Sequence, residues 1–552
     1  MRTWKVIVLV VLALASGFAL GIAEGELPFT KSDIAGSEKL AGLVFTDAER
    51  DSMQADLADY LKGYEALRGV PIANSVPPAL VFHTRGPRGD AAPAPRGKRV
   101  RLDKPTHSKR PRNLEEVAFW PVRDLAELVR TRQVSSTELT TMYLARLKRF
   151  GPQLECVVSL TEARALEQAR RADEEIKKGN YRGPLHGIPY GAKDLLAVQG
   201  TKTTWGSAVY KEQEIDETAT VIKRLDEAGA VLIAKLTLGE LAWGDVWFGG
   251  MTKNPWNLEQ GSSGSSAGSA SATSAGLVAF AIGTETWGSI VSPSTRCGTT
   301  GLRPTFGAVS RAGAMALSWS MDKIGPICRS VDDCAIVFDA IRGADALDPA
   351  ARDANFTYAP QAKLQGMRVG YVKAMFEEDN PNRARDNAVL EQLRALGAEL
   401  VPIELPKLPV MPLASILTAE AAAAFDDLTR SNRDDLLVRQ IKNAWPNALR
   451  GARFIPAVEY IQANRVRSLL MDEMEKLPVD VYVTPTFGGD NLLLTNLTGH
   501  PCVVLPNGFT DEGTPTSITF MGRLFGEGTL LAVANAYQDA TDFDEKHPKS
   551  FQ

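Results

Sequence analysis

Three segments of the 552-residue chain carry side chains that can take part in proton transfer and nucleophilic chemistry. A Gly/Ser-rich run, GSSGSSAGSASATS, extends from Gly261 to Ser274, and a second serine segment, GTETWGSIVSP, follows from Gly283 to Pro293. A third segment, GIPYGAKDLLAV, places Lys193 among mostly uncharged residues, where a strongly hydrated ammonium is not expected without a purpose. Two serines and a lysine suggest a relay for protons.

The proposed relay needs a base. A serine hydroxyl becomes a good nucleophile only when a base removes its proton, and histidine is the usual base. Neither His186 nor His500 is near a G-x-S-x-G turn with an acidic partner downstream. Lys193 can serve only when neutral, which requires burial or nearby positive charge to lower its pKa from about 10.4. Its apolar, glycine-rich surroundings are compatible with that, and Asp194 faces the other way if the segment is extended.

Composition alone favours plainer interpretations of the same segments. A Gly/Ser run is most often a flexible linker, and an isolated lysine most often lies on the surface. The run from Gly261 nevertheless continues without a break into the apolar sequence GLVAFAIGTET, which indicates backbone packed closely against backbone. Residues 283–289 further predict a tight turn, in which consecutive amide N–H groups can form an oxyanion hole.

These segments, in this order, resemble the amidase signature family of serine hydrolases. The family pattern is GxPxxxKD, a GGSSGG-like segment, a GTDxGGSI-like segment and CGxxGLKPT, where this chain has GIPYGAKD, SGSSAGSA, GTETWGSI and CGTTGLRPTFGAVSR. The resemblance covers residues 121–548, and four motifs in order are far more specific than any one of them. It implies Ser289 as the nucleophile and Lys193 as the base. In a gapless match it selects Ser265, not Ser262, as the bridging serine.

The resemblance implies acyl transfer without a metal or organic cofactor. Lys193 would accept a proton from Ser265, which would accept one from Ser289 as Ser289 attacks an amide carbonyl. Water would then hydrolyse the acyl-enzyme. The oxyanion would be held by the backbone N–H groups of Thr286, Trp287 and Gly288.

The chain departs from the family pattern at four positions near these residues. Trp287 and Ala267 replace glycines, Glu285 replaces an aspartate, and Val291 replaces an arginine. Either the backbone at Trp287 needs no positive φ, or the site is reshaped there. We expect a narrowed acyl pocket, which Trp287→Gly would widen, so an unchanged preference for bulky acyl groups in that variant would contradict the expectation.

The elements that must position these residues predict an α/β fold. Helical spacing and capping signals predict helices over residues 45–68, after Ser135, from Thr161 to about Gly179, and over 218–228. Apolar runs predict strands from Ala230, Met367 and Val479. This alternation, with the resemblance, predicts the amidase-signature fold, a large mixed β-sheet covered by helices on both faces, preceded by an N-terminal helical extension.

The domain organisation follows from shifts in composition along the chain. Residues 1–23 combine a basic start with an apolar stretch and predict a signal peptide or membrane anchor, and hence export to the periplasm or the extracellular space. A helical extension over 24–84 and a basic Pro/Gly-rich linker over 85–113 precede the amidase signature domain, 114–552. We interpret residues 85–113 as a linker or solvated arm. The alternative is that their basic charge contacts an anionic surface.

Charge and cysteine content exclude several other classes of protein. The net charge of −4 argues against nucleic acid as a partner, and the five histidines and five cysteines show no metal-binding spacing. Cys328 and Cys334 are close enough in sequence to form a disulfide after export, but two buried thiols are the favoured interpretation.

The resulting hypothesis is an exported amidase that acts on a small-molecule carboxylic acid amide. Esters and carbamates are accessible to the same acyl-enzyme chemistry. The alternative is the A subunit of a tRNA-dependent amidotransferase, which shares the motifs but acts in a cytosolic complex and is disfavoured by the export signal. A catalytically silent binding protein on the same fold is a third hypothesis.

Overall fold

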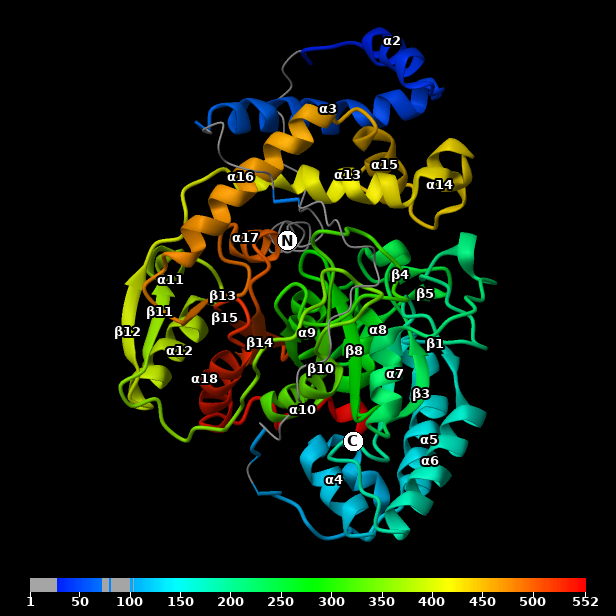
Figure 1. The fold of residues 1–552 in the computed structure, drawn as a ribbon, viewed down its shortest axis with the longest axis vertical. Coiled ribbons are helices and arrows are strands. Elements are labelled where there is room, and N and C mark those ends of the chain that lie inside the picture. Colours follow the sequence, from blue (N-terminus) through cyan, green and yellow to red (C-terminus); the bar gives the residue numbers. More distant parts are fainter. Residues whose placement is uncertain (1–26, 72–78, 81–99, 103) are drawn as a thin grey trace, which may run out of the picture. The chain divides into compact units, whose positions relative to one another are not determined.

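A computed structural model describes residues 27–71, 79–80, 100–102 and 104–552. The chain divides into two compact units (Figure 1). One comprises Met1–Leu80 and Leu408–Leu469, and the other comprises Val81–Lys407 and Leu470–Gln552. Residues 1–23, predicted as a signal peptide or anchor, lie outside the described residues. Among the residues that are described, no helix is both long enough and apolar enough to cross a membrane.

The larger unit is built on a mixed sheet of eleven strands, in the order β1-β3-β2-β8-β10-β9-β14-β15-β13-β11-β12. Pairs β2–β3, β2–β8, β11–β12 and β11–β13 are parallel, and the remaining pairs are antiparallel. The strands are β1 Val157–Leu160, β2 Pro189–Lys193, β3 Val231–Leu236, β8 Phe280–Glu285, β9 Thr300–Arg303, β10 Lys323–Cys328, β11 Arg368–Val372, β12 Glu399–Ile403, β13 Val481–Pro485, β14 Cys502–Phe509 and β15 Pro515–Gly522.

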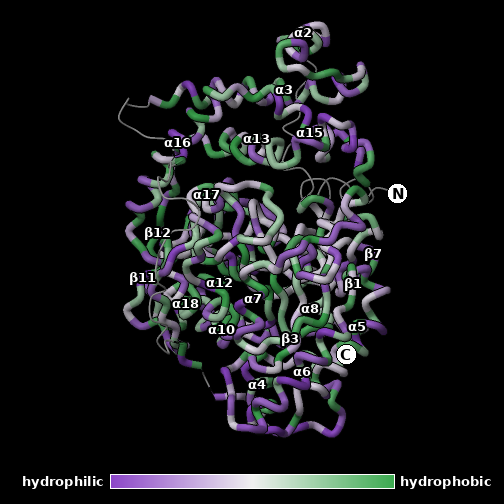
Figure 2. The backbone as a smooth tube through the Cα atoms, turned by 45° about the vertical axis from the view of Figure 1, so that its right-hand side comes forward, coloured by the Kyte–Doolittle hydropathy of each residue, from purple (hydrophilic) through white to green (hydrophobic). Residues whose placement is uncertain are grey.

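Helices cover this sheet on both faces, as the sequence predicts. Every residue of β2, β3, β8 and β10 is buried, which requires cover on both sides. In Figure 2 the chain around α4 is mostly hydrophilic, whereas hydrophobic stretches gather between α7, α8 and β3. The helices are α4 Val122–Arg130, α5 Ser136–Leu154, α6 Glu162–Lys177, α7 Thr220–Glu227, α8 Ala267–Ser274, α9 Val291–Cys297, α10 Val331–Ile341, α11 Lys373–Glu377, α12 Arg383–Ala395, α17 Asn491–Leu497 and α18 Glu527–Asp539.

Local sequence signals account for the bounds of several of these elements. Ser135 and Glu138 form the predicted capping box at the start of α5. Thr161 precedes α6, and α7 ends one residue before Ala228, close to the predicted bounds. Two short hairpins also precede α8, formed by β4 Val246–Trp247 with β5 Gly250–Met251 and by β6 Lys253–Asn254 with β7 Asn257–Gly261.

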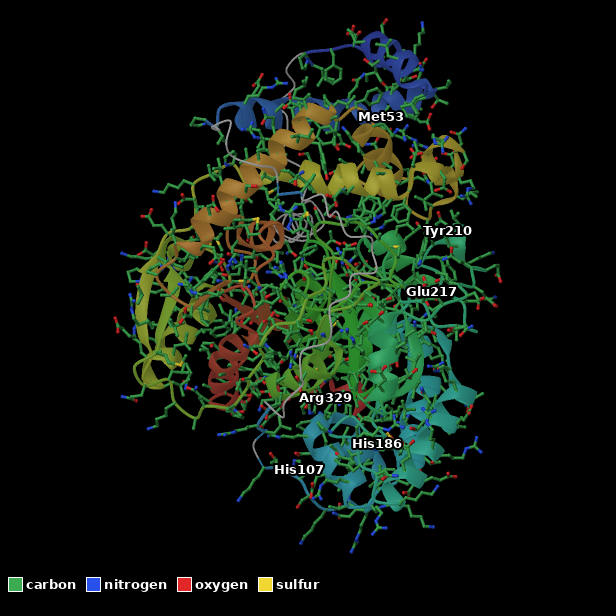
Figure 3. All side chains as sticks on the ribbon, in the orientation of Figure 1. Met53, His107, His186, Tyr210, Glu217 and Arg329 are labelled. Carbon is green, nitrogen blue, oxygen red and sulfur yellow. The ribbon has the colours of Figure 1, made fainter. Side chains whose placement is uncertain are left out.

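The smaller unit is helical and joins two distant stretches of sequence. Its core contains Ile34, Leu43, Phe45 and Met53, packed against Phe454 (Figure 3 labels Met53). Its helices are α2 Lys31–Ala41, α3 Asp47–Arg68, α13 Ala414–Ala424, α14 Asp426–Arg430, α15 Trp445–Ala452 and α16 Ala457–Glu475, the last extending beyond the unit.

This smaller unit joins the predicted N-terminal extension to a later stretch of the chain. The predicted helix over 45–68 is α3, with Met53 and Leu67 buried as its spacing requires, although Leu61 is exposed. Helix α3 packs against α15, which comes from within residues 114–552. The apolar faces of the two segments bury one another, a long-range pairing that periodicity does not encode.

The predicted linker falls largely outside the described residues. Its described end, 104–113, contains no helix or strand. The backbone N–H groups of Thr106 and His107 donate to the carboxylate of Asp124 on α4, at 3.1 and 3.0 Å. This end of the segment is therefore hydrogen-bonded to the larger unit, although most of its residues are exposed.

Candidate active site

The register of the central strands brings the candidate residues to one edge of the sheet. Strands β2 and β8 are parallel neighbours, so their last residues, Lys193 and Glu285, lie at the same edge. Strand β10 runs antiparallel to β8 and pairs Lys323 with Glu285, so it begins at this edge too. Helix α8 packs on these strands, and in Figure 1 β8, β10 and α8 lie together.

The Gly/Ser run is a close-packed part of the core, so its interpretation as a flexible linker is wrong. Every residue of α8 is buried, although the helix contains only small residues. A Cβ atom at Gly264 would lie 1.7 Å from the carbonyl oxygen of Gly244, and one at Gly268 would lie 2.4 Å from that of Cys156. Only glycine permits such backbone approach. The peptide bond between Gly264 and Ser265 is cis.

Lys193 is fully buried and surrounded by hydroxyl groups. Its Nζ lies 2.8 Å from Ser265 Oγ, 3.1 Å from Ser266 Oγ and 2.9 Å from Thr284 Oγ1. Burial lowers the pKa of Lys193 to about 7, although Asp322 and Glu285 act in the opposite direction. A lysine of this pKa is partly neutral at physiological pH and can accept a proton.

Asp194 points away from Lys193, as an extended segment predicts. Its carboxylate lies 2.7 Å from the Nζ of Lys235 and accepts hydrogen bonds from the backbone N–H and the hydroxyl of Thr204. Both members of the Asp194–Lys235 pair are fully buried. The neighbouring carboxylate therefore has a cation of its own and does not hold Lys193 in its charged form.

The structure places Ser265, and not Ser262, beside the lysine. The Ser262 hydroxyl donates to the carbonyl of Ser263 at 2.8 Å, whereas Ser265 Oγ contacts Lys193. Sequence reasoning missed two further partners of the lysine, Ser266 and Thr284. Ser266 Oγ donates to the Thr284 carbonyl at 3.0 Å and accepts from the Thr284 N–H at 3.1 Å. Only the packing of α8 on β8, which no local pattern signals, brings these two residues together.

Ser289 lies in the turn between β8 and α9 and is partly exposed, while Lys193 is buried. Its carbonyl accepts a hydrogen bond from the Ser266 N–H at 3.0 Å, which ties this turn to the segment that carries Ser265. The predicted turn over 283–289 is wrong at its start, because Gly283–Glu285 continue β8 as buried strand residues. The turn itself covers residues 286–290.

The backbone of this turn accommodates Trp287 without a left-handed conformation. The positive φ falls on Gly288, at 85°, and Trp287 is not among the non-glycine residues of positive φ. The first of the two alternatives for Trp287 is therefore correct, and the narrowed acyl pocket stays a prediction. Within the described part of the chain, the N–H groups of Gly288 and Ser289 donate to no acceptor. The oxyanion role of Thr286, Trp287 and Gly288 stays a prediction.

A buried ionic network holds both ends of the turn. One oxygen of Glu285 accepts from the N–H groups of Ile290 and Val291, at 2.8 and 2.9 Å. The other accepts from Arg303 and from Asn496, each at 2.8 Å. Burial alone would raise the pKa of Glu285, but Arg303 and these hydrogen bonds lower it to about 2. The glutamate that replaces the family's aspartate thus remains charged and anchors the turn.

The histidines take part in other interactions. His186 lies 3.1 Å from Glu175 on α6, near the cyan helices in Figure 3, and burial lowers its pKa. His500 Nδ1 lies 2.8 Å from the hydroxyl of Thr498, and burial lowers the pKa of His500 to about 4.

All five cysteines are free and buried, which confirms two buried thiols at Cys328 and Cys334. In the described ranges, no cluster of three or more His, Cys, Asp or Glu residues could hold a metal ion.

Comparisons with known proteins agree with this arrangement of motifs. A family model described as Amidase matches residues 138–493. The A subunit of the Glutamyl-tRNA(Gln) amidotransferase from Marinomonas sp. (strain MWYL1) is 32% identical over 77% of this chain and 98% of its own length. The native peptide amidase structure from Stenotrophomonas maltophilia has a TM-score of 0.67 and 31% identity, covering 76% of this chain and 96% of that one. An amidase family protein from Bacillus anthracis has a TM-score of 0.70 at 27% identity, covering 79% and 93%.

Proposed function

This chain belongs to the amidase signature family, and from that premise we propose that it hydrolyses a small carboxylic acid amide to the acid and an amine or ammonia. The observation that carries the proposal is the buried Lys193, whose Nζ lies 2.8 Å from Ser265 Oγ and whose pKa burial lowers to about 7. A base of this pKa is well matched to catalysis near neutral pH. The partly exposed Ser289 in the adjoining turn is the proposed nucleophile.

The proposed reaction passes through an acyl-enzyme. Neutral Lys193 accepts the Ser265 proton as Ser265 accepts the Ser289 proton, and Ser289 Oγ bonds to the amide carbonyl carbon. Backbone N–H groups of residues 286–288 stabilise the oxyanion. The proton returns from Lys193 to the leaving nitrogen when the carbon–nitrogen bond breaks. A water molecule, deprotonated by the same relay, then hydrolyses the ester and restores Ser289.

The first test combines substrate screening with removal of the nucleophile. We expect the purified chain to release amine or ammonia from at least one member of a panel of aryl, alkyl and peptide amides, with esters and carbamates included. Ser289→Ala should abolish this release and also abolish covalent labelling by a fluorophosphonate, because the attacking oxygen is missing. Full activity in folded Ser289→Ala, with its circular dichroism spectrum unchanged, would contradict the assignment.

An amidotransferase subunit is the second candidate, and it is favoured by the names of the curated relatives. The peptide amidase neighbours favour the hydrolase. The two proposals differ in what the isolated chain does. A chain that hydrolyses none of the panel alone, but releases ammonia from glutamine when glutamyl-tRNA and further subunits are added, would support the amidotransferase.

We also propose that the protein is exported, on the basis of the apolar residues 1–23. Cell fractionation, with mass spectrometry of the N-terminal peptide, tests this proposal. Recovery outside the cytosol with a peptide that begins near Glu24 indicates a cleaved signal, and recovery in membranes with an intact N-terminus indicates an anchor. Recovery in the cytosol would contradict export and would strengthen the amidotransferase candidate.

A further inference from the structure

A carboxylate outside the predicted relay lies beside the proposed oxyanion turn. Asp322 immediately precedes β10, and because β10 pairs Lys323 with Glu285, Asp322 lies next to the residue that follows Glu285. That residue is Thr286, whose hydroxyl donates to Asp322 Oδ1 at 2.6 Å. The first residue of the turn is therefore fixed by its side chain as well as by the end of β8.

The second oxygen of Asp322 binds a different loop. Its Oδ2 accepts the backbone N–H groups of Leu317 and Ser318, at 2.8 and 2.9 Å. Every one of these partners is a donor, which is the pattern expected of an ionised carboxylate. Hydrogen bonds to a charged acceptor are roughly twice as strong as neutral ones. One side chain thus joins the 286–290 turn to the 317–322 loop.

The same carboxylate contributes to the electrostatic environment of the proposed base. Burial lowers the pKa of Lys193, and Asp322 and Glu285 are the two anions that oppose this effect. Glu285 is paired with Arg303 at 2.8 Å. Burial raises the pKa of Asp322 above its ordinary value, and its three hydrogen bonds and the charge of Arg311 offset only part of this rise. The charge of Asp322 is therefore one of the quantities that determine how basic Lys193 is.

We propose that Asp322 is a positioning residue for the reaction proposed above, on which this inference rests. It holds the Thr286 end of the oxyanion turn at its fixed distance from the relay, and its negative charge sets how readily Lys193 takes up a proton. Asp322 acts through Thr286 and Lys193 and does not touch the substrate.

A fluorophosphonate serves as the probe, because its reaction does not depend on knowing the natural substrate. Ser289 Oγ bonds to phosphorus, fluoride leaves, and the serine proton passes through Ser265 to Lys193. The labelling rate is measured from pH 5 to pH 9 for the wild-type chain and for Asp322→Asn. We expect the plateau rate of the variant to fall on the order of 10- to 100-fold, because the turn is misplaced. The acid limb of its profile should also shift to lower pH, because an anion near Lys193 is gone.

Two further variants separate the two effects. Thr286→Val removes the hydroxyl but keeps the carboxylate, so its plateau rate should fall while its acid limb stays near that of the wild type. Asp386→Asn removes another buried carboxylate, which accepts from Asn507 on β14, and should change neither feature of the profile. If Asp322→Asn does not fold, the Thr286→Val plateau still decides whether this contact positions the turn.

The outcomes distinguish this inference from the proposed function. The role of Asp322 is overturned if Asp322→Asn leaves the acid limb of the labelling profile unchanged. It is also overturned if Thr286→Val leaves the plateau rate of labelling undiminished. Neither result changes the conclusion that Ser289 is labelled. If the Ser289→Ala variant is labelled at the wild-type rate, the proposed function is overturned instead. If Asp322→Asn lowers the melting temperature but keeps the wild-type pH profile of labelling, Asp322 has only a structural role.

Discussion

Two buried lysines at the edge of the sheet show what distinguishes a proposed base from a structural cation. Burial lowers the pKa of both Lys193 and Lys235. Lys235 faces the carboxylate of Asp194 at 2.7 Å, which favours its charged form. Lys193 is in contact with hydroxyl groups instead, which can accept a hydrogen bond from an ammonium or donate one to a neutral amine. The residue type is the same, and the partner decides the chemistry.

Comparison of two alanine variants tests which serine transfers the proton. Ser265→Ala removes the oxygen that contacts Lys193 and should lower the fluorophosphonate labelling rate on the order of 10³-fold or more, because relay members act as a unit. Ser262→Ala removes a hydroxyl that bonds only to the Ser263 carbonyl within the described chain, and should change the rate less than about tenfold. The reverse ranking would show that the register of the motif match is wrong.

At the scale of elements, the turn between β8 and α9 is held by the charge of Glu285. The N–H groups of Ile290, which precedes α9, and of Val291, its first residue, have no partner inside the helix and donate to this carboxylate. Because the pKa of Glu285 in the folded protein is about 2, below its ordinary value of 4.5, its contribution to stability is present above pH 4.5 and is lost as the pH falls toward 2.

Glu285→Gln should therefore destabilise the protein mainly at neutral pH. A shift of this size corresponds to about 3 kcal/mol in the free energy of unfolding. We expect the difference from the wild type in urea unfolding to be largest at pH 7 and smaller at pH 4. Glu404→Gln, which removes an exposed partner of Lys407, should leave the free energy of unfolding almost unchanged at both pH 7 and pH 4. A Glu285→Gln difference that does not shrink at pH 4 would indicate packing loss, not charge loss.

Elements with strong local signals were predictable from the sequence, and those set by distant contacts were not. The capping box at Ser135 and the helical spacing after Phe45 correctly predicted α5 and α3, because both signals lie within a few residues. The turn prediction failed at Gly283, since a glycine in a buried strand gives the same local signal as one in a turn. The contact between Asp322 and Thr286 depends on the pairing of β10 with β8, which no local pattern encodes.

At the scale of the whole molecule, the candidate site exists because the sheet order brings distant segments to one edge. Lys193 and Ser265 are 72 residues apart in the chain, yet their side chains are 2.8 Å apart. Motif order indicated the residues, but the sheet order and the packing of α8 determine their geometry. The pairing of the N-terminal helices with residues 408–469 could likewise not be predicted from the sequence, because each amphipathic segment can pack against several different partners.

A buried base has a cost in global stability, and the pH dependence of that cost tests the proposed mechanism. In the folded chain the pKa of Lys193 is about 7, against an ordinary value of 10.5, so between these values the unfolded chain binds more protons. Stability from this group therefore rises as the pH rises from 7 to 10.5. The penalty at pH 7 is on the order of 5 kcal/mol.

Lys193→Met should be inactive. Its free energy of unfolding at pH 7, compared with that of the wild type, should nevertheless be higher than the loss of the lysine's hydrogen bonds alone predicts. Its advantage over the wild type in urea unfolding should shrink steadily toward pH 10, where burial of a neutral lysine is no longer penalised. Lys235→Met provides the matched control, because it leaves the buried Asp194 unpaired and should destabilise the protein at both pH values. A Lys193→Met difference that is the same at pH 7 and pH 10 would mean that the folded protein keeps this lysine charged, and a charged lysine cannot accept the proton of Ser265.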